Sequence, residues 1–137
     1  HPRGYFVPEE HVLTGPFEIG DLRVTPVDLP HGSMGSTGYL FEQGEVKKLA
    51  YLTDAKSIPD EVIETVSGVE VAVLDALRPQ EHWTHMSTEE AIAASKKIGA
   101  KQTYLTHLTH YYDHDRDQSN LPDGVDLAWD GLKVQIA

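Results

Sequence analysis

Residues 69–77, VEVAVLDAL, constrain the fold of this 137-residue chain more than any other segment. They form an apolar run rich in β-branched residues, which is typical of strands buried in parallel or mixed sheets. A helix is predicted after the next loop, because Ser87-Thr88-Glu89-Glu90 has the pattern of a capping box and opens an alanine-rich segment to about Ile98. Gly99 is suited to end that helix. This alternation predicts an α/β fold.

Further strands and a second helix are predicted on both sides of this pair. The sequence predicts a loop over residues 1–16, two strands within 17–29 joined by a turn at Gly20-Asp21, a glycine-rich loop at 31–38, strands at 39–42 and 48–53, a helix at 57–66, a strand at 101–106, a polar loop over 109–123, and strands at 125–129 and 132–136 joined by a hairpin turn at Asp130-Gly131. The order predicts a mixed sheet.

Composition excludes several classes of function. The chain has no cysteine, so any metal must be held by histidine and carboxylate groups. The formal net charge of −11 disfavours binding to nucleic acid, whereas a small anionic substrate is compatible if a metal supplies positive charge locally. No apolar run approaches the ~20 residues that span a bilayer, so we expect no membrane association and a cytoplasmic location. The opening His1-Pro2-Arg3-Gly4 lacks methionine, which indicates an expression product, a processed form or a fragment.

Three polar residues, His31, Asp54 and His107, follow predicted strands where the chain leaves the sheet. Ligands gather at strand ends in α/β folds, because side chains there can converge. Zn²⁺ and Mn²⁺ accept imidazole and carboxylate ligands together, and one carboxylate can bridge two cations about 3.5–4 Å apart. The alternatives are loop histidines without a ligand role and, for Asp54, a cap on the following helix.

Other histidines lie in two loops. The spacing of His107 and His110 suits one metal ligand with a supporting residue, or two unrelated loop histidines. His114 and the aspartates beside it are interpreted as a solvated polar loop. His85 stands two residues before the cap Ser87, where the helix dipole disfavours an imidazolium and a nearby phosphate would restore it. A general-acid or phosphate-binding role and a plain surface position are both compatible with this placement.

Five segments and the C-terminal ending together resemble a known family. VDLPHG at 27–32, LTD at 52–54, VLDALR at 73–78, HMS at 85–87 and LTHLTH at 105–110 occur in the order seen in metallo-β-lactamase-fold hydrolases. The ending, with LPDGV at 121–125 and WDGL at 129–132, is similar to the subgroup containing the phosphoribosyl 1,2-cyclic phosphate phosphodiesterase of phosphonate breakdown. The resemblance covers nearly the whole chain from about residue 17.

The resemblance implies the C-terminal half of an αββα sandwich, with a mixed β-sheet and helices on one face. Residues 1–137 would form a single partial domain, because the family signature His-x-His-x-Asp-His is absent from the chain and is expected before residue 1. Complete domains of this kind need about two hundred residues or more. Such a half would expose a sheet edge and apolar surface, so we expect association with the missing N-terminal half or a homo-oligomer.

The resemblance also implies a role for each candidate residue. His31 and His107 match metal ligands, and Asp54 matches the aspartate that bridges two metal ions. His85 matches a histidine near the substrate phosphate that assists protonation of the leaving group, so His85 and Asp54 are the expected catalytic residues. His110 is expected to support the ligands or to lie at the rim of the site.

The implied function is that of a metal-dependent phosphodiesterase. In the complete protein two Zn²⁺ or Mn²⁺ ions would hold a hydroxide that attacks a small phosphodiester substrate, cyclic ones included, whereas this chain alone would be inactive or incomplete. Hydrolysis of thioesters, lactones or RNA precursors stays open within the same fold, although the acidic charge disfavours a tRNA substrate. A non-catalytic binding module and an association-prone half-domain are the alternatives outside enzymes.

Overall fold

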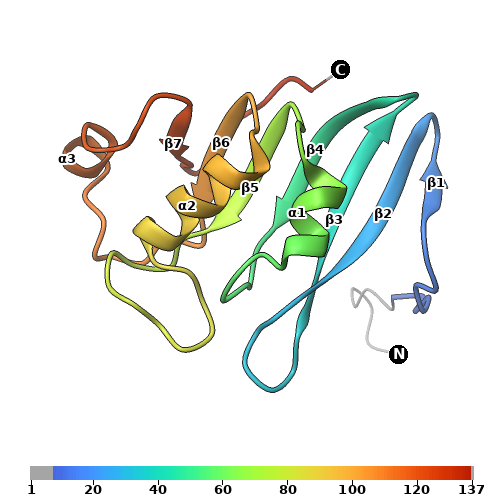
Figure 1. Ribbon diagram of the computed structural model, residues 1–137, viewed down its shortest axis with the longest axis horizontal. Helices are drawn as coiled ribbons and strands as arrows, with labels where there is room; N and C mark the ends of the chain where they lie inside the picture. Colours follow the sequence, from blue (N-terminus) through green and yellow to red (C-terminus); the bar gives the residue numbers. More distant parts are fainter. Residues whose placement is uncertain (1–7, 137) are drawn as a thin grey trace, which may run out of the picture.

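Seven strands form a single sheet in the computed structural model, which describes residues 8–136. Their spatial order follows the chain order, and helices α1 and α2 lie on the same face of the sheet (Figure 1). The elements are β1 (Phe17–Ile19), β2 (Leu22–Leu29), β3 (Ser36–Gln43), β4 (Val46–Leu52), α1 (Asp60–Val66), β5 (Val71–Asp75), α2 (Thr88–Ile98), β6 (Gln102–Thr106), α3 (His114–Gln118) and β7 (Val125–Leu127). The predicted α/β class, with a mixed sheet and helices on one face, is confirmed.

The first four strands are antiparallel neighbours. Ile19 pairs with Leu22, so Gly20 and Asp21 form the predicted two-residue turn between β1 and β2. Gly20 has a φ of 62°, in the left-handed region that such tight turns require. β3 begins at Ser36, so the glycine-rich loop ends earlier than predicted. Of the predicted N-terminal loop, residues 1–7 lie outside the described residues, and residues 8–16 contain no helix or strand.

From β4 onward neighbouring strands are parallel. Helix α1 connects β4 to β5, and α2 connects β5 to β6. Because parallel strands run in one direction, the carboxyl ends of β4 to β7 meet at one edge of the sheet. Two antiparallel steps separate β2 from β4, so β2 also ends at this edge. Ligands of open α/β sheets bind at such an edge, which we call the carboxyl edge.

The core lies between the sheet and the helical layer. Apolar side chains of the strands face inward at every second position, as period-two alternation requires. The buried members include Leu40, Ala50, Leu52, Leu74 and Leu105 from the strands, Val62 and Val66 from α1, and Ala91 and Ile98 from α2.

Helix α2 begins and ends as the sequence predicts. The Ser87 hydroxyl accepts a hydrogen bond from the backbone N–H of Glu90, and the Glu90 carboxylate accepts one from the N–H of Ser87. These reciprocal bonds satisfy two N–H groups that have no partner within the helix. Gly99 ends the helix in the left-handed conformation, with a φ of 67°. The cap holds the start of α2 in place beside the loop that carries His85.

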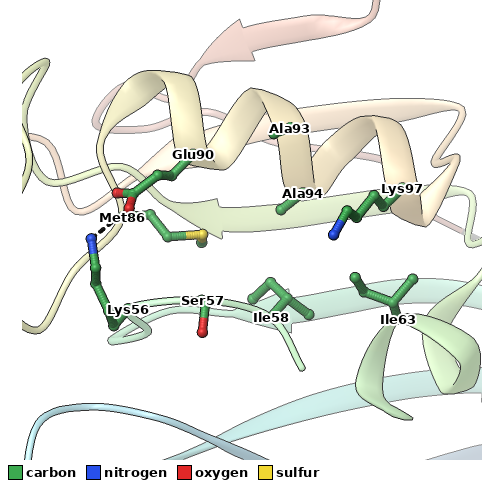
Figure 2. Close-up of a pocket in the computed structure, with 9 residues that line it drawn as sticks. All are labelled: Lys56, Ser57, Ile58, Ile63, Met86, Glu90, Ala93, Ala94 and Lys97. Atoms are coloured by element: carbon green, nitrogen blue, oxygen red, sulfur yellow. Dashed lines mark hydrogen bonds and ion pairs between the residues drawn. The ribbon is translucent and has the colours of Figure 1, made fainter. Parts of the chain in front are cut away.

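A groove separates α1 and α2 within the helical layer (Figure 2). Ile58, Ile63 and Met86 give it an apolar lining, and an ion pair between Lys56 Nζ and Glu90 Oε1 closes one end at 2.5 Å. Burial by itself raises the pKa of Glu90, but hydrogen bonds from Lys56 and Ser87 outweigh it and hold this pKa below the usual value. Glu90 therefore stays ionised at neutral pH while it caps α2.

One predicted helix and one predicted loop differ from the structure. Helix α1 begins at Asp60, after Pro59, rather than at residue 57, so Asp54 lies too far upstream to cap it. The polar segment 109–123 contains the short helix α3, which the sequence analysis missed. Asp113 caps α3 by accepting a hydrogen bond from the N–H of Arg116.

The predicted C-terminal hairpin is wrong. Asp130 and Gly131 do form a turn, in which the N–H of Leu132 donates to the carbonyl oxygen of Trp129 at 3.0 Å. However, β7 pairs in parallel with β6, and residues 132–136 form no strand. Strand β7 forms its backbone hydrogen bonds with β6, so it does not need residues 132–136 as a second strand to pair with.

The sheet face opposite the helices carries apolar and aromatic side chains. Strand alternation and register place Tyr39 and Phe41 of β3, Leu49 and Tyr51 of β4, and Val73 of β5 on this face. Tyr51 is 43% exposed although it lies in a central strand. We call this surface the open face. No helix within residues 8–136 is long and apolar enough to cross a membrane.

Glu70, the residue before β5, bonds to a lysine in β4 and to the lysine just before β6, at the edge opposite to the carboxyl edge. Its carboxylate accepts hydrogen bonds from Lys48 Nζ at 2.9 Å and Lys101 Nζ at 3.0 Å, and these bonds hold the pKa of Glu70 below its usual value of 4.5. Since the folded pKa is depressed, this stabilisation is present above about pH 4.5 and is lost as pH falls through the folded pKa.

We therefore expect Glu70→Gln to lower the melting temperature at neutral pH and to leave it nearly unchanged at the acid end. Thermal unfolding, monitored by circular dichroism from about pH 3 to about pH 7, measures both effects. Glu64→Gln, an exposed carboxylate on α1, is the matched control. Parallel pH curves for wild type and Glu70→Gln would contradict the expectation.

Candidate functional site

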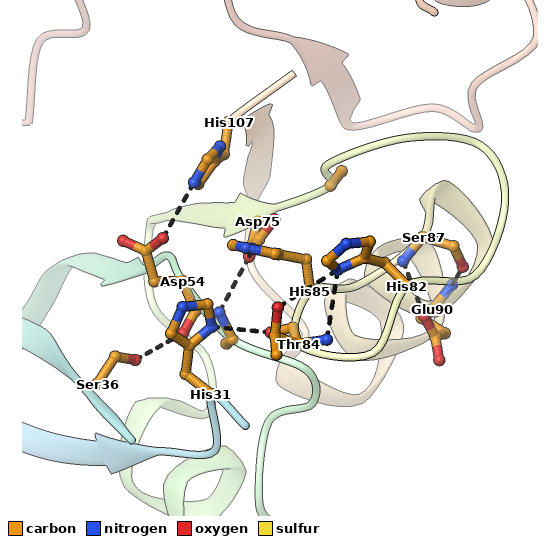
Figure 3. Close-up of polar contacts among 12 residues, drawn as sticks. His31, Ser36, Asp54, Asp75, His82, Thr84, His85, Ser87, Glu90 and His107 are labelled. Carbon is orange, nitrogen blue, oxygen red and sulfur yellow. Dashed lines mark hydrogen bonds and ion pairs between the residues drawn. The ribbon is translucent and has the colours of Figure 1, made fainter. Parts of the chain in front are cut away.

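Polar side chains gather at the carboxyl edge (Figure 3). His31 follows β2, Asp54 follows β4, and His107 follows β6 directly. Asp75 is the last residue of β5, and His85 reaches the same point from the loop before α2. The structure thus brings His31, Asp54, His85 and His107 together, and it adds Asp75.

Asp54 and His107 have strained backbone conformations. Their φ angles are 55° and 61°, and they are the only two non-glycine residues with positive φ among residues 8–136. A left-handed residue with a Cβ costs roughly 1–2 kcal/mol, and such strain tends to concentrate at functional sites. Here it turns both side chains toward each other, so that His107 Nε2 lies 3.0 Å from Asp54 Oδ1. These side chains are 42% and 48% exposed, so solutes can reach them.

His31 is held in one tautomer. Its Nδ1 lies 2.9 Å from the carbonyl oxygen of Thr84, which can only accept a hydrogen bond, so Nδ1 must carry the proton. In the neutral ring Nε2 then has a free lone pair. Histidines that bind metals commonly donate their other N–H to a carbonyl or carboxylate in this way.

His85 and Asp75 form a buried pair. Asp75 is fully buried, and its Oδ2 accepts hydrogen bonds from His85 Nδ1 at 2.5 Å and from the backbone N–H of Ala55 at 3.0 Å. The carboxylate fixes the orientation of the imidazole. Nε2 of His85 remains for the site. His85 is a site residue predicted from the sequence, whereas Asp75 stands inside an apolar run, where no local pattern indicates its role.

The spacing of ligand atoms suits a metal ion. His31, Asp54 and His85 each offer one ligand atom, and these atoms lie within 4.8 Å of one another. The His85 ring lies between those of His31 and His107, at centroid distances of 4.7 and 4.8 Å. His107 joins the group through its bond to Asp54. We call these four residues the edge cluster. The geometry makes His85 a candidate for a ligand as well as for proton transfer.

Two other histidines differ in their relation to the edge cluster. The imidazole of His110 is exposed and packs on Tyr111 at a centroid distance of 4.5 Å, and no hydrogen bond or ring contact joins it to the cluster within the described part of the chain. His82, which the sequence analysis did not single out, lies 5.2 Å from His85. Desolvation, followed by the positive charge of Arg78, lowers the pKa of His82, so this ring is neutral at pH 7.

The donor set fits a divalent cation. Imidazole nitrogens and a carboxylate are the ligands that Zn²⁺ and Mn²⁺ share, and the chain has no cysteine to compete with them. Two ligands of one tetrahedral zinc ion lie ~3.3 Å apart, given bond lengths of about 2.0–2.2 Å. The 3.0 Å between His107 Nε2 and Asp54 Oδ1 is close to that spacing.

Residues 6–108 match the family model described as the beta-lactamase superfamily domain. The chain therefore belongs to the beta-lactamase superfamily. Its mixed seven-stranded sheet with helices is consistent with the metallo-β-lactamase type of fold, and the predicted family is confirmed.

Individual relatives add detail. A diphosphatase from the PhnP family has a solved structure that is 36% identical, with a TM-score of 0.84 over 92% of this chain and 48% of that one, and it agrees with the predicted subgroup. Zn²⁺-bound PqqB from Methylobacterium extorquens is 17% identical, with a TM-score of 0.69 over 91% of this chain and 54% of that one, and supports the fold alone. An octanoyltransferase from Porphyromonas gingivalis is 32% identical over 88% of this chain and 24% of that protein. The chain thus spans about half of these structures and a quarter of that relative.

Proposed function

We propose that the complete protein is a metal-dependent hydrolase that cleaves small phosphodiesters or related phosphoric anhydrides. The observation that carries the proposal is the edge cluster, in which three imidazoles and one carboxylate from distant parts of the chain meet at the carboxyl edge. Similarity to a diphosphatase of the PhnP family supports chemistry at phosphorus. The similarity to the octanoyltransferase is weaker evidence about function, because the match covers only 24% of that protein.

His31, Asp54 and His107 would hold the cations, with Zn²⁺ and Mn²⁺ as the candidate metals and two ions in the complete protein. Bound cations would supply an activated nucleophile at neutral pH and positive charge opposite the phosphoryl oxygens. The carboxylate of Asp54 has two oxygens, so it can contact both ions. The exposure of Asp54 and His107 leaves room for a substrate beside them.

His85 would act as the proton donor. When its ring is protonated, Nδ1–H remains bonded to Asp75 and Nε2–H is available to the departing oxygen of the substrate. As the bond between phosphorus and that oxygen breaks, transfer of the proton leaves neutral His85 and, from a phosphodiester, an alcohol. Asp75 supports this step as a positioning residue, because the buried carboxylate keeps Nε2 aimed at the site. His110, whose ring packs on Tyr111, is proposed only as a rim residue.

We also propose that the open face is covered by another segment of the complete protein. The chain spans 48% of the similar diphosphatase, so that protein has as much chain again with which to cover such a face. The partly exposed Tyr51 and its apolar neighbours would favour that contact. We expect the 137-residue chain alone to bind the dye ANS and to self-associate, and the complete protein to do neither. Strong dye binding by the complete protein, or a dimer that forms through this face, would contradict the proposal.

A metal-and-substrate assay tests the hydrolase proposal. Complete protein, as its gene encodes it, is analysed for metal by inductively coupled plasma mass spectrometry and assayed with bis(p-nitrophenyl) phosphate, p-nitrophenyl acetate and a thioester. We expect bound Zn²⁺ or Mn²⁺, activity on the phosphodiester, loss of activity with a chelator and recovery on adding either metal. Activity on the acetate or thioester alone would identify another reaction of the fold. Weak, substoichiometric metal with no activity would identify a binding module.

A further inference from the structure

Trp129 occupies the carboxyl edge beside the edge cluster. The four parallel strands end in turn near Asp54, Asp75, His107 and Trp129, and Trp129 comes two residues after β7. Its side chain is 53% exposed. An open hollow of about 320 Å³ lies between the ends of β6 and β7, and its lining residues are Thr106, His107, Leu108, Ala128, Trp129 and Asp130. His107, a proposed metal ligand, thus forms part of the wall of this hollow.

The backbone on both sides of Trp129 is held by hydrogen bonds, and one ring packs on its exposed indole. On one side the N–H of Ala128 donates to Leu105 O at 2.8 Å, and on the other the N–H of Leu132 donates to Trp129 O at 3.0 Å. The His114 ring contacts the indole edge to face, with centroids 5.9 Å apart and an angle of 83°. The exposed ring therefore presents a flat apolar surface on a fixed backbone, so that only its side-chain torsions remain to be ordered on binding.

The lining indicates which ligand group fits. None of the six lining residues is lysine or arginine, and Asp130 adds a carboxylate, so a second anionic group is disfavoured there. A neutral planar ring is favoured instead, because it can stack on Trp129 and donate hydrogen bonds to Asp130. About 300 Å³ is the lower end of the range of small-molecule pockets, which suits one ring system rather than a whole substrate.

We propose that Trp129 is a stacking platform for a nucleobase or similar planar ring, attached to the phosphate that reacts at the edge cluster. The inference rests on the proposed function and deepens it, since it assigns the substrate class as nucleotide-like phosphoric esters. The ring belongs to the arm that stays on the phosphate. The leaving arm lies on the side of His85, where a second exposed tryptophan, Trp83, lines a separate hollow with Lys56, Glu81 and His82.

Two substrates with one leaving group test this assignment in the complete protein. Thymidine 5′-(p-nitrophenyl phosphate) carries a nucleoside arm and methyl p-nitrophenyl phosphate does not. We expect Trp129→Ala to lower kcat/KM for the nucleoside substrate about 10-fold relative to the methyl substrate, within the roughly 5- to 150-fold typical of base–aromatic stacking. Trp129→Phe should retain most of the preference. Trp83→Ala is the matched control, and it should alter both substrates equally.

Failure of this inference differs from failure of the proposed function. An unchanged ratio in Trp129→Ala, or an equal loss on both substrates, overturns the stacking role while hydrolysis itself stands. If wild type cleaves neither substrate, calorimetric titration of the Zn²⁺-treated protein with thymidine 5′-monophosphate and with methyl phosphate gives the answer. Tighter binding of the nucleotide that disappears in Trp129→Ala supports the platform, and equal binding of the two ligands overturns it.

Discussion

Asp54→Asn is expected to weaken metal binding by the complete protein at least about 100-fold, beyond the 10- to 100-fold typical of residues that only support a ligand. The substitution removes the negative charge and one oxygen that can contact a cation, but it preserves shape. Asparagine tolerates the left-handed conformation that Asp54 adopts at a φ of 55°, so the backbone need not move. The effect therefore reports on the carboxylate rather than on strain.

Competition with a chromogenic chelator measures this affinity, and hydrolysis of bis(p-nitrophenyl) phosphate should fall with it. Asp123→Asn, an exposed aspartate in the turn before β7, provides the matched control and should bind metal like wild type. Circular dichroism should show the same fold for all three proteins. Full metal occupancy in Asp54→Asn would remove Asp54 from the ligand set and with it the central residue of the proposal.

Asp75→Asn is expected to lower kcat about 10²- to 10⁴-fold while KM changes little. Oδ2 accepts both the Nδ1–H of His85 and the N–H of Ala55, so an amide oxygen in its place keeps both bonds without the negative charge, whereas an NH₂ group there loses the Ala55 bond and turns the ring to the other tautomer. Either orientation removes the carboxylate that fixes the imidazole for proton transfer. Loss of the charged hydrogen bond in this fully buried position should also destabilise the fold by about 1–3 kcal/mol.

A pH–rate profile separates the positioning role of Asp75 from a structural one. We expect the shape of the profile to change in Asp75→Asn, and ¹⁵N spectra of the imidazole to show a changed tautomer. A purely structural role would lower stability and leave the shape of the profile unchanged. That result would remove Asp75 and His85 as a proton-transfer pair.

Local signals predicted those parts of the fold that short stretches of chain control. The turn at Gly20-Asp21, the capping box at Ser87 and the helix end at Gly99 all match the structure, because each depends on hydrogen bonds or φ angles within a few residues. The sequence contains a similar local signal for helix α3, because Asp113 caps this helix by accepting the N–H of Arg116, three residues later. The surrounding run of polar residues made the segment resemble a loop. The Asp130-Gly131 turn shows the limit of such signals: the turn forms, but its flanks do not pair.

The edge cluster is also only partly predictable from the sequence. His31, Asp54 and His107 were predicted as site residues because each follows a strand, which is a property of each residue's own segment. Their meeting depends on strand order, because His107 and Asp54 are 53 residues apart and touch only when β4, β5 and β6 lie in parallel register.

The sequence by itself determined the α/β class, the strands and helices that carry the edge cluster, and the residue types available to a metal. Only the tertiary structure decided that Asp75 fixes His85, that His31 is held in one tautomer by Thr84, and that Trp129 stands next to His107. The physical reason is that a hydrogen bond or ring contact between distant segments depends on packing in three dimensions, which no pattern of neighbouring residues encodes.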